Sequence, residues 1–224
     1  MTFRPPVIAI DGPSASGKGT VAREVADALG FHFLDSGTLY RLVALAALEQ
    51  GADLENASDI AAIARTLDVT FDPHAIWLDG RRVTDAIRSE EVGAVASRVA
   101  ALQPVRTALL ERQRAFREAP GLVADGRDMG SVVFPDAALK IFLTADAAER
   151  ARRRYKQLME KGMSASMDAL LQEIRDRDAR DSERAAAPLQ KSADALELDT
   201  TGMSVEDVVA EVLARYRKRA TQAP

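Results

Sequence analysis

The chain has 224 residues, which is long enough to build one sizeable α/β core with small insertions. Its 30 basic and 34 acidic side chains give a net charge of −4, which disfavours binding to nucleic acid through an overall positive field. Because it has no cysteine, the chain cannot form disulfides, bind zinc through thiolates or use a thiol nucleophile.

The N-terminal segment Met1–Pro6 leads directly into an apolar run and lacks the pattern of a secretory signal peptide. No apolar stretch of the sequence reaches the roughly 18 residues that a membrane-spanning helix needs. The sequence therefore predicts a cytoplasmic protein without a membrane partner.

In chain order, the first predicted element is a buried strand at Val7–Asp11, an apolar run that ends in Asp. A helix is expected at Lys18–Leu29, and Gly30 supplies its stop signal. The next predicted elements are a strand at Phe31–Leu34, a turn at Asp35-Ser36-Gly37, a helix at Thr38–Gln50, and a helix at Ser58–Leu67 capped by Ser58.

The pattern changes after residue 68, where short β-like runs are separated by turn residues. These runs are Val69–Phe71, Ala75–Leu78 and Arg82–Thr84. The dipeptide Asp79-Gly80 is a strong hairpin signal, so we expect a β-rich insertion here.

The remainder of the chain again alternates between helical and strand-like segments. The predicted elements are helices at Glu90–Ala101 and Pro104–Glu118, strands at Gly121–Asp125 and Lys140–Thr144, helices at Ala147–Lys161 and Ser166–Ala186, a strand at Ala195–Leu198, and a helix that Ser204 opens and that ends near Ala220. Strands that alternate with helices around one core predict an α/β fold, in which a parallel sheet carries helices on both faces.

The run from Gly12 to Lys18, Gly-Pro-Ser-Ala-Ser-Gly-Lys, matches the phosphate-loop pattern G-x-x-x-x-G-K and lies between a predicted strand and a predicted helix. In such a loop, backbone N–H groups and the helix N-terminus surround phosphate oxygens, and the lysine neutralises the β- and γ-phosphates. The predicted ATP-binding residues are Gly12, Pro13, Ser14, Ala15, Ser16, Gly17, Lys18, Gly19 and Thr20.

Gly19 follows the loop lysine at the position where Ser or Thr is usual, and the hydroxyl comes one residue later, at Thr20. We therefore do not expect the first hydroxyl after the lysine to bind Mg²⁺ directly, and we assign no direct protein ligand for this ion. The ending Gly-Lys-Gly-Thr resembles that of nucleoside monophosphate kinases, in which Mg²⁺ is held largely by phosphates and water.

Two other classes of phosphate-loop protein are disfavoured. None of the six lysines has Asp two residues later, so the base-reading motif of GTPases is missing. The predicted strand ending at Asp125 is followed by Gly126, Arg127 and Asp128, with no adjacent Glu to polarise a water. This favours transfer to a bound acceptor over hydrolysis, and a phosphate acceptor is already a nucleophile that needs no catalytic base.

Three further motifs follow the phosphate loop: Asp35-Ser-Gly-Thr-Leu-Tyr-Arg41, Ala124-Asp-Gly-Arg-Asp-Met-Gly130 and Arg177-Asp-Ala-Arg-Asp-Ser-Glu-Arg184. In this order they resemble the motifs of bacterial cytidylate kinases, over nearly the whole chain. The resemblance implies a three-layer P-loop NTPase fold with a core at 1–35, 107–149 and 167–224. It also implies a monophosphate-binding lobe at 36–106, with the β-rich insert near 69–84, and a short helical lid at 150–166.

The resemblance implies ATP-dependent phosphorylation of CMP, and of dCMP, by a monomer that uses Mg²⁺. The implied catalytic residues are Lys18, Arg127 and Arg153, and Arg153 would close from the lid onto the ATP phosphates. The implied CMP-binding residues are Ser36, Arg41 and Arg127 on the phosphate, Ser97, Arg106, Asp128 and Arg184 around the cytosine, and Arg177 and Asp181 on the ribose.

Ala15 departs from the resemblance, because the family often has glycine at this position. A left-handed backbone at an alanine would cost on the order of 1 kcal/mol, so we expect a negative φ at Ala15.

Three alternatives stay open from the sequence alone. The first is a kinase of the same fold with another acceptor, such as UMP, shikimate or gluconate. The second is an ATP-binding regulator without catalytic activity. The third is an RNA-binding protein that uses the arginine-rich stretch 150–184, although the many acidic residues of that stretch weaken its field.

Overall fold

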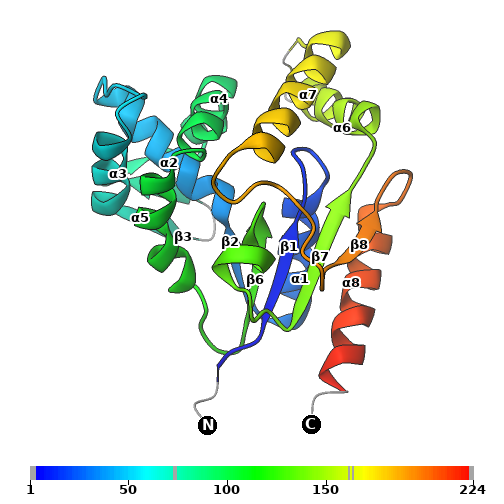
Figure 1. The fold of residues 1–224 in the computed structure, drawn as a ribbon. Coiled ribbons are helices and arrows are strands. Elements are labelled where there is room, and N and C mark those ends of the chain that lie inside the picture. The colour runs from blue at the N-terminus through cyan, green and yellow to red at the C-terminus, as the bar shows by residue number, and fades with distance from the viewer. Residues whose placement is uncertain (1–3, 73–74, 161, 163, 222–224) are drawn as a thin grey trace. The chain divides into compact units, whose positions relative to one another are not determined.

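The computed structural model describes residues 4–72, 75–160, 162 and 164–221 (Figure 1). The chain divides into two compact units, one made of residues 1–34 together with 116–224 and one made of residues 35–115. The first unit is thus built from both ends of the chain, whereas the second is one continuous segment. Among the described residues, no helix is both long and apolar enough to cross a membrane.

The first unit is built around a sheet whose five described strands lie in the order β2-β6-β1-β7-β8. The strands are β1 (Val7–Asp11), β2 (His32–Asp35), β6 (Leu122–Gly126), β7 (Leu139–Thr144) and β8 (Leu196–Asp199). The central strand β1 pairs in parallel with both β6 and β7, and β7 pairs in parallel with β8. Every residue of β1 and β6 is buried, as expected for parallel strands covered on both faces.

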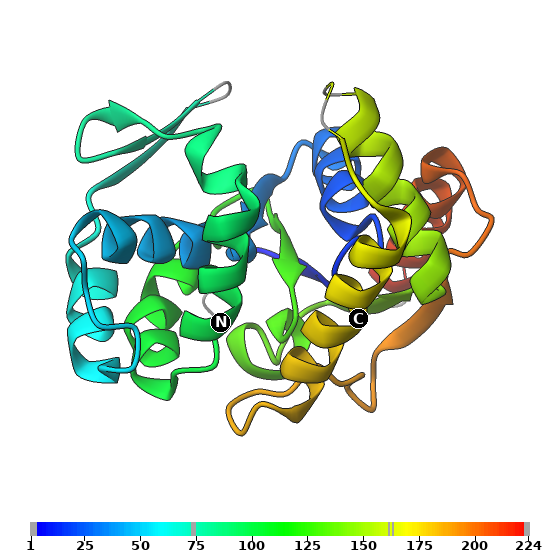
Figure 2. The same cartoon turned by 90° about the horizontal axis from the view of Figure 1, so that it is seen from above.

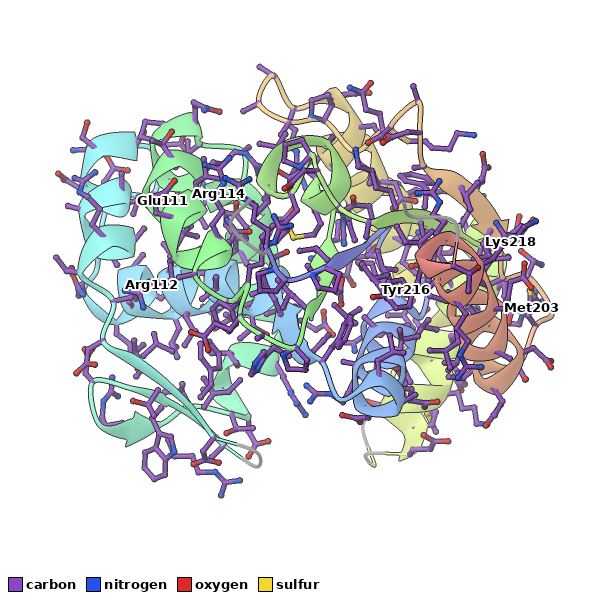
Figure 3. The ribbon with its side chains drawn as sticks, turned by 90° about the horizontal axis from the view of Figure 1, so that it is seen from below. Glu111, Arg112, Arg114, Met203, Tyr216 and Lys218 are labelled. Atoms are coloured by element: carbon purple, nitrogen blue, oxygen red, sulfur yellow. The ribbon has the colours of Figure 1, made fainter. Side chains whose placement is uncertain are left out.

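In the described part of this unit there are four long helices: α1 (Lys18–Leu29), α6 (Ala147–Glu160), α7 (Met167–Glu183) and α8 (Val205–Ala220). Apolar side chains of α1 and α8 form one core with β1, β6, β7 and β8. Tyr216 of α8, labelled in Figure 3, meets the ring of Phe31 edge to face, with ring centroids 5.8 Å apart. Helices α6 and α7 pack side by side (Figure 2).

The second unit combines helices with a small antiparallel sheet. Its elements are α2 (Ser36–Glu49), α3 (Ala57–Thr66), β3 (Val69–Asp72), β4 (Ala75–Leu78), β5 (Arg81–Arg82), α4 (Glu90–Val99) and α5 (Gln103–Arg114). Helix α2 is buried along most of its length and packs against both α3 and α4, so it forms the centre of this unit. Arg112 of α5, labelled in Figure 3, donates to the Leu67 carbonyl at the end of α3, which joins these two helices.

Most predicted elements are confirmed, because they were predicted from sequence patterns that lie within the elements themselves. The predicted bounds of β1, α1 and β4 agree with the structure. The hairpin at Asp79-Gly80 is also confirmed, with φ values of 49° and 71°. Both residues are left-handed, as a type I′ turn requires.

Several details of the predicted elements are wrong, and helix α5 ends at Arg114 and not at Glu118. Asn56, and not Ser58, caps α3, because its side chain accepts from the N–H groups of Ser58 and Asp59. Ser36 and Gly37 belong to α2, since the Asp35 side chain caps the helix before them. The third strand of the insertion covers Arg81–Arg82 and not Arg82–Thr84.

Helix α7 stops at Glu183 and not at Ala186, because Arg184 takes an extended conformation. Lys161, where α6 was predicted to end, lies outside the described residues. The sequence also missed two short segments, a 3₁₀ turn at Ala86–Arg88 and a π-helical turn at Met129–Val133.

Candidate active site

The loop from Gly12 to Thr20 joins β1 to α1 at the carboxyl end of the central strand. The Lys18 ammonium donates to the Pro13 carbonyl of the same loop at 3.2 Å and lies 3.9 Å from Oδ1 of Asp125. Both side chains are largely shielded from solvent. The loop thus holds its lysine inward, next to the buried carboxylate at the end of β6.

Ala15 corrects one prediction, because its φ is 56° and not negative. The left-handed backbone at this position is part of the curl of the loop, and alanine bears a strain on the order of 1 kcal/mol for adopting it. On either side of Ala15, the hydroxyls of Ser14 and Ser16 are buried and have no hydrogen-bond partner among the described residues. An unpartnered buried hydroxyl is costly, and phosphate oxygens are acceptors that would satisfy it.

Gly19 stands where a phosphate loop usually carries Ser or Thr, and the structure gives a reason. A Cβ at Gly19 would lie 2.9 Å from Oδ2 of Asp125, so the carboxylate occupies the space that a side chain would need. The described residues contain no cluster of three or more His, Cys, Asp or Glu side chains that could hold a metal. One buried carboxylate beside a phosphate loop fits Mg²⁺, which keeps several waters and binds phosphates.

Arg153 of α6 contacts the phosphate loop. Its guanidinium donates to the Ser16 carbonyl at 3.2 Å and to the Thr200 carbonyl at 2.7 Å, and its Nε donates to Glu149. The structure therefore places this predicted catalytic residue beside the loop, in contact with backbone carbonyls.

Arg150, one turn earlier in α6, is a buried residue that sequence reasoning did not single out. It donates to the Ser14 carbonyl at 3.1 Å and forms a bidentate pair with Asp178 of α7 at 3.1 and 2.5 Å. This arginine joins the phosphate loop, α6 and α7. Its partner lies 28 residues away, beyond the reach of any local sequence signal.

The motif after β6 meets α7 through a buried ion pair. Nε of Arg127 donates to Oδ2 of Asp181 at 2.8 Å, and both side chains are largely buried. Burial disfavours charge on both groups, but their mutual attraction outweighs it and raises the pKa of Arg127 while lowering the pKa of Asp181. Arg177 and Arg184 also lower the pKa of Asp181, so four of the predicted CMP-binding residues form one cluster.

Asp128 is buried and begins the π-helical turn at Met129–Val133. The backbone N–H groups of Met129 and Gly130 both donate to the carboxylate of Asp11, each at 2.8 Å. Burial, together with a smaller effect of the Asp128 charge, raises the pKa of Asp11 to about 6, even though these two hydrogen bonds act to lower it. Asp11 therefore anchors the turn that carries Asp128, a role that sequence reasoning missed.

The second unit holds the other predicted CMP-binding residues. Nη1 of Arg41 donates to the Ile87 carbonyl at 2.7 Å and to the Ser89 carbonyl at 3.3 Å, just before α4. Arg106 is buried, donates to the Ala100 carbonyl and lies over the ring of Tyr40, 5.9 Å from its centroid. Ser36 and Ser97 are also buried, and the Ser97 hydroxyl has no hydrogen-bond partner in the described part of the chain.

Comparison with known families gives a direct result, because residues 8–218 match the family model described as "Cytidylate kinase". The chain belongs to the cytidylate kinase family. The cytidylate kinase of Bordetella pertussis is 61% identical over 208 residues, which cover 93% of each chain. That of Nitrosomonas eutropha is 59% identical over 94% of each chain, and that of Stutzerimonas stutzeri is 60% identical over 96% of each chain.

A solved structure also resembles this member of the cytidylate kinase family. A gluconokinase from Sinorhizobium meliloti matches with a TM-score of 0.50 over 97% of this chain and 95% of the other, at 17% identity. At so low an identity the likeness concerns the fold alone, which is the P-loop α/β fold predicted from the sequence.

Proposed function

We propose that this protein transfers the γ-phosphoryl group of ATP to CMP, and also to dCMP. The observation that carries the proposal is the phosphate loop, where Lys18 lies inward beside Asp125 and the hydroxyls of Ser14 and Ser16 are buried without a partner among the described residues. Membership of the cytidylate kinase family and relatives of that name at about 60% identity support CMP as the acceptor.

In the proposed reaction, an oxygen of the CMP phosphate forms a bond to the γ-phosphorus. The bond between that phosphorus and the β,γ-bridging oxygen breaks, and ADP leaves with the electron pair. The attacking oxygen already carries negative charge, so the reaction needs positioning and charge stabilisation and no general base. Lys18 would stabilise the charge on the transferring group, and backbone N–H groups of the loop would hold the β-phosphate.

For the acceptor, we assign Ser36, Arg41 and Arg127 to the CMP phosphate. Arginine suits this task because its planar donors match phosphate oxygens in bidentate fashion. The fixed orientation of Arg127 on Asp181, and of Arg41 on two backbone carbonyls, supports this assignment. We assign Arg177 and Asp181 to the ribose.

For the base, we assign Ser97, Arg106, Asp128 and Arg184. A carboxylate only accepts hydrogen bonds, so Asp128 suits the amino group of cytosine and repels O4 of uracil. Arginine only donates, so Arg106 or Arg184 suits the cytosine acceptors and cannot satisfy N3–H of uracil. The Ser97 hydroxyl has no hydrogen-bond partner among the described residues, which supports the proposal that a ligand binds at that face of α4.

Mg²⁺ would be held mainly by the ATP phosphates and water, with Asp125 accepting from a metal-bound water; the ion would neutralise phosphate charge. Arg153 would act on the ATP phosphates as part of a lid at 150–166, and residues 36–106 would form the monophosphate-binding lobe. A monomeric state and a cytoplasmic location complete the proposal.

A coupled assay of ADP formation with ATP and Mg²⁺ against CMP, dCMP, UMP, shikimate and gluconate tests the proposal. We expect CMP and dCMP to be the best acceptors and UMP to be poorer by about 10²-fold, because uracil leaves two polar groups mismatched. ADP formation without acceptor should be negligible, and Lys18→Ala, which removes the loop charge, is the negative control. A higher efficiency with shikimate or gluconate would overturn the choice of acceptor, and turnover independent of acceptor would overturn phosphoryl transfer to CMP.

A further inference from the structure

Gly93 is the fourth residue of α4, inside the helix, where glycine is the least favourable residue apart from proline. It is buried, and its neighbours in the helix include good helix formers. A glycine at such a position usually marks a close approach by another group.

The group that approaches Gly93 is the guanidinium of Arg41, from α2 of the same unit. A Cβ at residue 93 would lie 2.9 Å from Nη2, 3.2 Å from Nη1 and 3.3 Å from Cζ of Arg41. The guanidinium therefore rests in the space that any side chain at residue 93 would fill.

Backbone carbonyls hold the guanidinium in this position. Nη1 donates to the carbonyls of Ile87 and Ser89, and the Ser89 carbonyl also accepts the N–H of Gly93. Ser89 is the N-cap of α4, and its hydroxyl accepts from Val92. The position of the Arg41 guanidinium is thus set by two backbone carbonyls just before α4 and by the absence of a side chain at Gly93 in that helix.

The same face of α4 carries a second polar group. Ser97 follows Gly93 by four residues, so the two lie one turn apart on one side of the helix. The Ser97 hydroxyl is buried and has no partner among the described residues. One helix face therefore presents a guanidinium and, a turn further, a hydroxyl that a ligand could satisfy.

We propose that Gly93 is a positioning residue for the acceptor nucleotide, because its missing side chain sets where the Arg41 guanidinium lies. This rests on the proposed function, in which Arg41 binds the CMP phosphate. A side chain at residue 93 would push the guanidinium away from the helix and weaken its bond to Ile87.

The geometry predicts that such a change affects activity and not stability. The colliding atoms are at the far end of a flexible side chain, so Arg41 can move while α4 stays in place. Alanine also favours the helix over glycine. A purely structural glycine would show the reverse behaviour, with a loss of stability and unchanged nucleotide kinetics.

The first experiment compares Gly93→Ala with Ala94→Gly, an opposite change on the exposed face of the same helix. For Gly93→Ala we expect the KM for CMP to rise about tenfold, because a displaced phosphate-binding group costs up to about 10²-fold. The KM for ATP and the Tm should stay near the parent values. Ala94→Gly should lower the Tm by a few degrees and leave the KM for CMP unchanged.

The second experiment repeats Gly93→Ala in an Arg41→Ala background. If Gly93 acts through Arg41, the second substitution should add no further loss, so that the two are strongly coupled. An equal rise in KM for CMP in both backgrounds would overturn the inference, and so would a Gly93→Ala protein whose Tm drops by many degrees. If Arg41→Ala raises the KM for CMP while Gly93→Ala does not, only the inference fails. If Arg41→Ala itself has no effect, the proposed role of Arg41 fails and the inference with it.

Discussion

At the scale of single residues, the burial and position of Asp128 bear on the choice of base. This residue is buried at the start of a turn that Asp11 anchors, so the backbone that carries its carboxylate is held in place. A buried carboxylate on an anchored backbone can only accept hydrogen bonds, so it is suited to distinguishing an amino group from a carbonyl oxygen.

We therefore expect Asp128→Asn to change discrimination more than overall turnover. The efficiency with CMP should fall by about 10-fold or more, whereas UMP should fall much less or improve, because an amide can donate to O4. The dependence on Mg²⁺ should not change. Steady-state kinetics with both acceptors over a range of Mg²⁺ concentrations checks this. An equal loss for CMP and UMP would show that Asp128 does not read the base and would assign it to holding Mg²⁺ or to the support of Arg127.

Asp11 gives a prediction about pH. Its folded pKa is raised from 3.8 to about 6, mainly by burial, so the folded state binds the proton more tightly than the unfolded state. The stabilisation from this proton is fully present below pH 3.8 and is lost as the pH rises through about 6. When the pH is lowered from 7 to 5, the free energy of unfolding of the wild type should rise by about 1 kcal/mol relative to that of Asp11→Asn, because the asparagine does not titrate.

Thermal unfolding of the two proteins from pH 7 to pH 5 measures this gain. The difference in Tm should move in favour of the wild type by about 2–4 °C, a typical response for a chain of this size. Stability is a cleaner readout than activity here, because the phosphate of a monophosphate acceptor also titrates near pH 6. A difference in Tm that stays constant over this range would show that Asp11 titrates outside it.

At the scale of elements, one buried pair joins α6 to α7 and to the phosphate loop. Arg150 is buried and Asp178 is 26% exposed at its side chain, so the pair is only partly screened by solvent. Removing one member of a buried pair leaves the other charge uncompensated, which costs about 3–5 kcal/mol when burial is complete. The partial exposure of Asp178 reduces the expected cost to about 2 kcal/mol.

Asp178→Asn should therefore lower the free energy of unfolding by about 2 kcal/mol in urea denaturation. The matched control is Glu160→Gln, which breaks the exposed i,i+4 pair with Lys156 on the same α6 helix and should cost less than about 0.5 kcal/mol. Equal costs for the two substitutions would mean that the link between α6 and α7 adds no more than a surface ion pair.

The elements also show what could be predicted from the sequence. The strand β1, the phosphate loop and α1 follow from an apolar run, a glycine-rich turn and a glycine stop that are adjacent in the chain. Errors arose where neighbouring residues compete for one role, as Asn56 and Ser58 do at the start of α3. The left-handed Ala15 was missed because the demands of the loop override the preference of the residue.

The contacts that organise the site lay beyond local signals. Asp11 meets Met129 across 118 residues, and Arg127 meets Asp181 across 54. The resemblance to the family pointed to Arg127 and Asp181 as binding residues. Only the structure shows that these two side chains form an ion pair with each other. Gly93 had no sequence signal, since one helical glycine has many possible causes and its neighbour Arg41 lies on another helix.

At the scale of the whole molecule, the chain order of the two units has a consequence for synthesis on the ribosome. Residues 35–115 are continuous and can complete their core before the rest of the chain is made. The strand β1 cannot, because Val7 pairs with Leu122, 115 residues later. At about 5–20 residues per second, β1 waits roughly 6–23 s for its first neighbour. During that interval its apolar side chains and open edges are a natural target for a chaperone and a point of aggregation in a stalled chain.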